Sequence, residues 1–333
     1  MGRTRQQLLR TAVVGVVVVL LAGACGSSGN EEPANEESRE AALLDQARTL
    51  FQLPDGDPVA GVRVANCPGS AARSVCMYVV NSMFDLTGPN QWSQNGKVSL
   101  TYSNFAAESG IMTGAYSPPT SMPNNPDASV WWRMESEGMF TGSVGTVYYG
   151  APRPYPTGER VGFYGSVPYS GGNTFECRDG TYLRCRVAAV SGTEKDAIAL
   201  YEVTNAPVVV RITNRLGTQV AREGEAATTS FVAVPAAGNP TSVAPNGTAY
   251  AGGYRSISQD SRYTATYVVG DAEPNLGGAR AVANIIIDPK TGADKGSKCE
   301  VSNPRSTGTQ LQCKVSVSGG ESGVVYADVT LLR

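Results

Sequence analysis

The chain has 333 residues and a formal net charge of −2, and it contains no histidine. The absence of histidine excludes a Ser-His-Asp or Cys-His mechanism and any histidine-ligated metal site. The slightly acidic charge, without a basic tract, argues against a nucleic-acid partner. With 38 glycines, 20 prolines and 15 tyrosines, the composition is typical of all-β, loop-rich extracellular domains. We therefore expect neither a cofactor nor a metal, and a binding protein rather than an enzyme.

The first 24 residues have the pattern of an export signal. Arginines precede an apolar run over 12–24, and a helix of that length would reach about 20 Å, short of the roughly 30 Å hydrocarbon core of a bilayer. The sequence Ala-Gly-Ala-Cys at 22–25 fits ordinary signal cleavage, and it also resembles the lipobox of bacterial lipoprotein precursors. That resemblance implies that Cys25 carries a lipid, so that the exported protein is anchored to the outer face of the cell membrane.

The number of cysteines distinguishes these two interpretations. The chain has seven cysteines, so lipidation of Cys25 leaves six for three disulfides, which an exported protein can form and keep. Ordinary cleavage would leave an odd thiol on a secreted protein. We therefore favour lipidation and expect the other six cysteines to be paired: Cys67, Cys76, Cys177, Cys185, Cys299 and Cys313.

The segments after the signal change character in order along the chain. Residues 25–35 combine the lipidated cysteine with an acidic, small-residue tether. Residues 36–60 are expected to form one short amphipathic helix and a connector, because apolar side chains recur at helical spacing before Pro54. Later residues alternate with a period of two between Gly, Pro and Asn clusters, which predicts strands. The stretch 192–204, "GTEKDAIALYEVT", fits either a helix or a strand.

Six landmarks recur in the same order in the two halves of the chain and indicate an internal repeat. After the first landmark their spacing stays between 120 and 128 residues, and the wider first spacing indicates an insertion among the early strands. We therefore expect two tandem antiparallel β-sandwich units, at 61–203 and 204–333. The paired landmarks are VVN at 79 and ITN at 212, PTSM at 119 and PTSV at 240, WR at 132 and YR at 254, TVYYG at 146 and TYVVG at 266, VGFYGSVP at 161 and VANIIIDP at 282, and two cysteine pairs.

The repeat also suggests the disulfide connectivity. Six cysteines allow 15 pairings, but two pairs occupy matching places, each as a staple across a hairpin near the end of its unit. The third pair follows by exclusion and lies before the first unit. The predicted disulfides are Cys177–Cys185, Cys299–Cys313 and Cys67–Cys76.

Aromatic side chains are densest between Ser117 and Gly150. Strand alternation places Trp132 with apolar neighbours on one face, and Trp131 with Arg133 and Glu135 on the other. One tryptophan is then in the core, while the other can belong to a recognition patch, because amphipathic aromatics suit ligand contact. Alternatively, these aromatics only fill the core. The candidate ligand-binding residues are Trp131, Arg133, Phe140, Tyr148 and Tyr149.

Residues 75–190 also resemble the aegerolysin-type β-sandwich proteins. The resemblance is carried by "GMFTGSVGTVYYG" and "VPYSGGNTFEC", and Val144 stands where that family commonly has an acidic residue. It implies a small β-sandwich, and the family is associated with recognition of membrane lipids and, with partner proteins, with pore formation. The positions carried over are Thr141, Gly142, Gly145 and Asn173.

Two acidic segments have alternative interpretations. Glu135 and Glu137 could form a catalytic or calcium-binding carboxylate pair, but a solvated strand face is favoured. Residues 288–296 resemble a calcium loop without its closing glutamate and are expected to form a turn. We expect non-catalytic recognition at the cell envelope, with a lipid, glycan or protein ligand. The alternatives are a carboxylate-dependent hydrolase and a purely architectural envelope component.

Overall fold

The computed structural model describes residues 73–88, 91–93, 99–109, 111–112, 117–136, 140–234, 240–271, 275–303, 310–319 and 323–333. The chain divides into two compact units, 1–40 and 41–333, and every described strand belongs to the second unit. The predicted export signal, lipidated Cys25, tether and helix at 36–60 lie outside the described residues.

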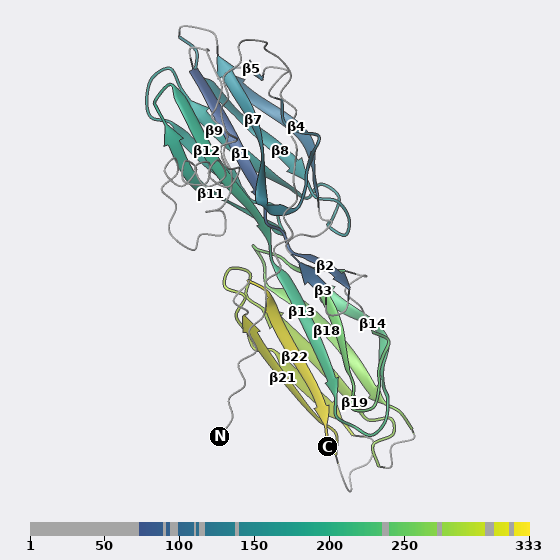
Figure 1. The fold of residues 1–333 in the computed structure, drawn as a ribbon. Coiled ribbons are helices and arrows are strands. Elements are labelled where there is room, and N and C mark those ends of the chain that lie inside the picture. The colour runs from purple at the N-terminus through teal and green to yellow at the C-terminus, as the bar shows by residue number, and fades with distance from the viewer. Residues whose placement is uncertain are drawn as a thin grey trace, which may run out of the picture. The chain divides into compact units, whose positions relative to one another are not determined.

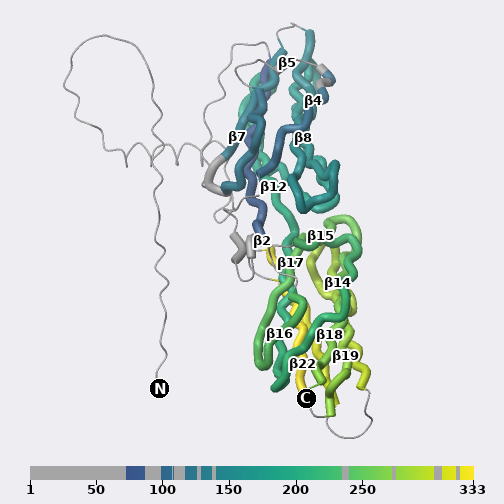
Figure 2. Tube along the Cα trace, turned by 90° about the vertical axis from the view of Figure 1, so that its right-hand side faces the viewer, coloured from purple at the N-terminus to yellow at the C-terminus, as the bar shows by residue number. Residues whose placement is uncertain are grey.

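Ten strands form a first sandwich of two five-stranded sheets (Figure 1). One sheet has the order β11-β12-β1-β7-β5 and the other has the order β10-β9-β8-β4-β6. Figure 2 shows β7 and β8 in different layers. The strand bounds are β1 Arg73–Asn81, β4 Leu100–Ser109, β5 Ile111–Met112, β6 Ser121–Met122, β7 Asn125–Ser136, β8 Ser143–Gly150, β9 Arg160–Val167, β10 Thr174–Arg178, β11 Leu183–Gly192 and β12 Asp196–Asn205.

Ten further strands form a second sandwich, so the prediction of an all-β protein with sandwich units is confirmed. Its sheets have the orders β15-β17-β13-β22-β21 and β16-β14-β18-β19-β20. The strand bounds are β13 Pro207–Asn214, β14 Val220–Thr229, β15 Phe231–Ala233, β16 Ser242–Val243, β17 Thr248–Arg255, β18 Ser261–Val269, β19 Arg280–Ile287, β20 Lys298–Ser302, β21 Gln312–Gly319 and β22 Val325–Leu332.

The two sandwiches have the same topology, strand for strand. Adding ten to the number of each strand from β4 to β12 gives its counterpart, and β1 corresponds to β13. The short hairpin of β2 (Asp85–Gly88) and β3 (Gln91–Ser93) has no counterpart and is the insertion that the landmark spacing predicted. The ambiguous stretch 192–204 contains strand β12 and no helix.

The structure adds one parallel strand pair to each of the predicted antiparallel units. In the first sandwich β1 pairs with β12 in parallel, and in the second β13 pairs with β22 in parallel. Parallel neighbours need a crossover connection, and here the chain supplies it by passing through the opposite sheet before the last strand returns beside the first. The period-two pattern of the sequence does not carry this information.

Asparagines at the ends of β1 and β13 show that the repeat holds at the level of single residues. The Asn81 amide nitrogen donates to the Met122 carbonyl at 3.2 Å, and its oxygen accepts from the Met83 backbone nitrogen at 3.2 Å. Asn214 donates to the Val243 carbonyl at 3.2 Å, and its oxygen accepts from the backbone nitrogen two residues ahead. The first two landmarks therefore match residue for residue.

The landmark that pairs Trp132 with Tyr254 is out of register by three residues. Trp132 lies opposite Met77 in β1, and the corresponding position in β13, Val210, lies opposite Ala251. The shift arises because residues 126–128 of β7 are unpaired, between Asn125 and Ser129, whereas β17 pairs continuously. A bulge of this kind is invisible in the sequence pattern.

Two of the predicted disulfides are present, and each joins the edges of two sheets. Cys177 in β10 bonds to Cys185 in β11, and Cys299 in β20 bonds to Cys313 in β21. Because these strand pairs lie in opposite sheets, each disulfide links the two sheets of its sandwich and not the two strands of one hairpin, as had been expected. Cys76 is disulfide-bonded, and because its partner lies outside the described residues, the pairing with Cys67 stays a prediction.

Candidate functional site

The five predicted ligand-binding residues do not form one patch. Tyr149 lies in the core against Trp132, with ring centroids 5.8 Å apart, and its hydroxyl donates to the Pro119 carbonyl at 2.7 Å. Phe140 is 71 % exposed, and its ring meets another exposed ring, Tyr169, edge to face at 5.2 Å between centroids. The remaining three residues lie on the outer faces of the two sheets.

Trp131 and Arg133 share the outer face of the sheet that contains β1, as strand alternation predicted. Trp131 is half-buried and stacks on Tyr78, with ring centroids 5.8 Å apart. The Arg133 side chain is only 3 % exposed, and its guanidinium lies 2.7 Å from the Glu135 carboxylate. The prediction of a solvated charged face was therefore wrong for Glu135, because this carboxylate is buried against an arginine. Glu137 lies outside the described residues.

Tyr148 faces outward from the sheet of β8, β9 and β10, beside two exposed arginines. The guanidinium carbon of Arg160 lies 4.6 Å from the centre of the Tyr148 ring, which is a cation–π contact. Arg178 donates from Nη1 to the Tyr148 hydroxyl at 2.8 Å. This hydrogen bond raises the pKa of Arg178, so the guanidinium stays charged across the physiological range.

A second tyrosine, Tyr164, lies beside Arg178 on the same sheet. The Arg178 guanidinium carbon lies 5.5 Å from the centre of the Tyr164 ring. Between the tyrosines, Gly162 lies opposite Tyr148 in β8 and Arg178 in β10. A Cβ at Gly162 would come within 2.7 Å of the Tyr148 ring, so glycine lets this ring lie against the sheet. We call Tyr148, Arg160, Tyr164 and Arg178 the tyrosine–arginine face.

The second sandwich carries no such face at the corresponding positions. Arg280 begins β19 as Arg160 begins β9, but it pairs with the Glu223 carboxylate at 2.8 Å. Four residues further along β19, Asn284 stands where β9 has its tyrosine, and it hydrogen-bonds Thr264. In the described part of the chain neither Arg160 nor Arg178 forms an ion pair. At these equivalent positions Arg280 pairs with a carboxylate, whereas Arg160 lies on an aromatic ring.

The aegerolysin-like positions have structural roles. A Cβ at Gly142 would lie 2.5 Å from the backbone of Pro168, and one at Gly145 would lie 2.4 Å from the Phe105 ring. Asn173 donates to the Thr193 carbonyl at 3.0 Å. Close packing therefore accounts for both glycines without a ligand.

The described residues provide neither a metal site nor a calcium loop. No group of three His, Cys, Asp or Glu side chains within those residues is placed to hold a metal ion. Residues 288–296 form a turn in which the Asp288 carboxylate accepts from the backbone nitrogens of Lys290 and Thr291, which lowers its pKa to about 2. The same part of the chain contains no helix that is long and apolar enough to cross a membrane.

Comparison with known proteins gives weak likenesses only. No protein-family model matches the chain, and no curated protein matches it significantly. Among solved structures, the lipid-binding protein Nakanori is 14 % identical over 50 % of this chain and 77 % of its own, with a TM-score of 0.28. A major pilin mutant from Streptococcus pyogenes is 8 % identical over 78 % of this chain and 98 % of its own, with a TM-score of 0.27. At these values neither likeness bears on function.

Proposed function

We propose that the protein is a non-catalytic envelope lipoprotein that binds an acidic polysaccharide through the tyrosine–arginine face. Flat tyrosine rings suit contact with sugar rings, because one side of the ring is apolar and the hydroxyl remains polar. Guanidinium groups suit uronate carboxylates, because their planar fork makes paired hydrogen bonds. A sheet face that alternates the two side chains offers both interactions along an extended polymer.

This proposal rests on a difference between the two repeats. Both units have the same topology, yet at the equivalent strand starts Arg160 lies on the Tyr148 ring while Arg280 pairs with the Glu223 carboxylate. A purely structural role would be served equally well by the internal pair Arg280–Glu223 of the second unit. The unpaired arginines and their tyrosines are therefore the features that an anionic ligand would use.

The envelope location rests on the sequence and on the disulfides. The lipobox at Cys25 supports a lipid anchor on the outer face of the cell membrane. The disulfides Cys177–Cys185 and Cys299–Cys313 support export, because such bonds persist in oxidising compartments and are rare in the cytosol.

A hydrolase is the less favoured alternative. It would use Glu135, but that carboxylate is buried beside Arg133, a setting that holds it as a structural counter-ion. A purely architectural role would leave the tyrosine–arginine face without a ligand. Binding measurements separate both alternatives from the proposal.

The test uses the chain with Cys25→Ser, which removes the lipid, and two polymers: alginate, a polyuronate, and neutral dextran. We expect saturable binding to alginate and none to dextran. The double variant Tyr148→Ala with Arg160→Ala should bind alginate at least tenfold more weakly, a loss of about 1.4 kcal/mol. Arg280→Ala is the matched control, since Arg280 starts the equivalent strand, and it should bind as the parent does. Equal alginate affinity in the double variant would contradict the proposal.

A further inference from the structure

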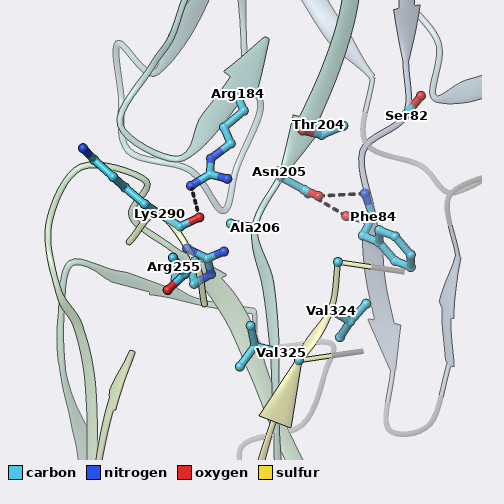
Figure 3. A pocket seen from close by; sticks show the side chains of 13 residues that line it. Ser82, Phe84, Arg184, Thr204, Asn205, Ala206, Arg255, Lys290, Val324 and Val325 are labelled. Carbon is cyan, nitrogen blue, oxygen red and sulfur yellow. Dashed lines mark hydrogen bonds between the residues drawn. The ribbon is translucent and has the colours of Figure 1, made fainter. Parts of the chain in front are cut away.

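The compact unit 41–333 contains a cavity of ≈ 310 Å³ whose wall includes two arginines (Figure 3). Arg184 comes from β11, and Arg255 is the last residue of β17. Phe84 and the turn at Lys290 and Thr291 also line the cavity. Its size is sufficient for a small ligand, since binding pockets begin near 300 Å³.

Both guanidinium groups are held by the same short stretch of backbone. Arg184 donates from Nη2 to the carbonyls of Pro289, at 2.6 Å, and Lys290, at 3.1 Å. Arg255 donates from Nη1 to the Asp288 carbonyl at 3.1 Å and also to the Pro289 carbonyl. Neutral carbonyls thus fix the two cations next to each other without cancelling their charge.

The cavity carries positive charge that the described residues do not neutralise. Among them, neither arginine forms an ion pair with a carboxylate. The Asp288 carboxylate is the acidic group near Arg255, but it is engaged by backbone nitrogens of its own turn and lies 3.6 Å from Lys295. Burial, and next the neighbouring charge of Arg184, lower the pKa of Arg255 to about 10. Arg255 therefore remains charged at neutral pH.

Arg255 is also short of hydrogen-bond partners. The residue is 5 % exposed, and its Nε atom is buried with no partner. A buried donor without an acceptor is costly, more so on a charged group. Arg133 in the first sandwich, which is 3 % exposed, has a carboxylate at 2.7 Å. The contrast shows that a buried arginine in this protein can be given an internal counter-ion, and that Arg255 has none among the described residues.

Gly292 leaves room for the Arg255 side chain in the turn. It has a φ of +73°, which favours glycine. A Cβ there would lie 2.7 Å from a methyl carbon of Val325 and 3.3 Å from Nη2 of Arg255. The turn is therefore shaped around the guanidinium, and the arginine is held in a defined position.

We propose that this cavity binds an oxyanion, the carboxylate or phosphate group of a small ligand, which bridges Arg184 and Arg255. An oxyanion supplies the acceptors that the remaining guanidinium donors lack and cancels the repulsion between the two cations. Phe84 offers an apolar contact for the body of the ligand. This site shares no residue with the tyrosine–arginine face and does not depend on the function proposed for it.

Two small anions serve as probes: inorganic phosphate and benzoate, titrated at constant ionic strength against chloride. We expect saturable binding of at least one of them by calorimetry, with a rise in Tm that grows with its concentration. Arg184→Gln should weaken that binding at least tenfold. The control is Arg262→Gln, an exposed arginine of β18 without a described partner, which should leave binding unchanged.

The test uses Arg184→Gln because Arg184 is only partly buried, whereas a variant of the buried Arg255 can fail to fold. Urea unfolding of each variant confirms that the fold is retained. The proposal is overturned if neither anion binds saturably, or if Arg184→Gln keeps the parent affinity. Tyr148→Ala with Arg160→Ala should bind both anions as the parent does, so failure of alginate binding and failure of this site are separate results.

Discussion

The ion pair of Arg133 and Glu135 places two charges on a sheet face where the sequence pattern predicted solvent. Both residues are more than 90 % buried, so each has lost most of its hydration. Such a pair contributes little net stability as a pair, but removal of one partner leaves the other charge buried and uncompensated.

Glu135→Gln should therefore lower the free energy of unfolding by about 3 kcal/mol. Urea unfolding followed by tryptophan fluorescence measures the change. The matched control is Glu223→Gln, which breaks the pair with Arg280, whose side chains are 49 % and 53 % exposed, and should cost at most about 1 kcal/mol. Equal losses in the two variants would show that Arg133 does not depend on its carboxylate.

The two inter-sheet disulfides occupy equivalent places at the sandwich edges. Cys185 lies opposite Val203, and Cys313 lies opposite Leu331, which are the last residues of β12 and β22 to pair in parallel with β1 and β13. Each bond ties an outermost strand of one sheet to an outermost strand of the other. These edges are where a sandwich without the bond would open first, because edge strands have one hydrogen-bonded neighbour.

Replacement of Cys299 and Cys313 by serine should lower the free energy of unfolding by about 3 kcal/mol, mainly because the unfolded chain regains the entropy of the loop. The entropy of the loop depends only on the logarithm of the sequence separation, which is 14 residues for Cys299–Cys313 and 8 for Cys177–Cys185. The Cys177 and Cys185 double variant should therefore lose a similar free energy of unfolding. Urea midpoints of the two variants measure this. A loss below about 1 kcal/mol in both would contradict the chain-entropy account.

The sequence predicted strands and their order well, and register poorly. Asn81 and Asn214 were found because a buried amide that closes a strand end tolerates few replacements, and the cysteines because their chemistry is distinctive. Trp132 and Tyr254 were matched three positions apart, since the sequence pattern does not give the number of residues that the bulge at 126–128 adds. Period and composition define elements, whereas pairing depends on contacts between distant strands.

The same limit explains why the sequence did not predict the candidate site as a whole. Tyr148 was singled out for its residue type, yet Arg160 and Arg178 reach it only because β9 and β10 lie beside β8 in one particular register. Trp131, Arg133 and Tyr149 were grouped with it by closeness in sequence. Trp131 and Arg133 lie in the other sheet, and Tyr149, its neighbour in β8, lies in the core. A cavity that joins Arg184 to Arg255 has no signal in the sequence at all.

The duplicated fold allows the two units to be compared directly. Their topologies agree, but the first core is filled largely by aromatic and methionine side chains and the second mainly by valine, isoleucine, leucine and alanine. The outer faces that contain β9 and β19 differ: Arg160 and Arg178 lie on tyrosine rings in the first unit, and Arg280 is paired with Glu223 in the second. A recognition surface on one copy leaves the other free to serve as a folded support, and a lipid anchor would hold both at the membrane.

The proposed anchor makes a prediction for the whole protein. Lipid chains on Cys25 should give stable membrane association, because each buried methylene contributes about 0.8 kcal/mol and more than one chain is attached. Cys25→Ser should therefore move the protein from the membrane fraction to the aqueous phase on detergent phase separation, while Ser28→Ala, in the same tether, should leave it with the membrane. Mass spectrometry of the mature parent should show an N-terminal cysteine that carries acyl chains. An unmodified thiol at that position would contradict the anchor.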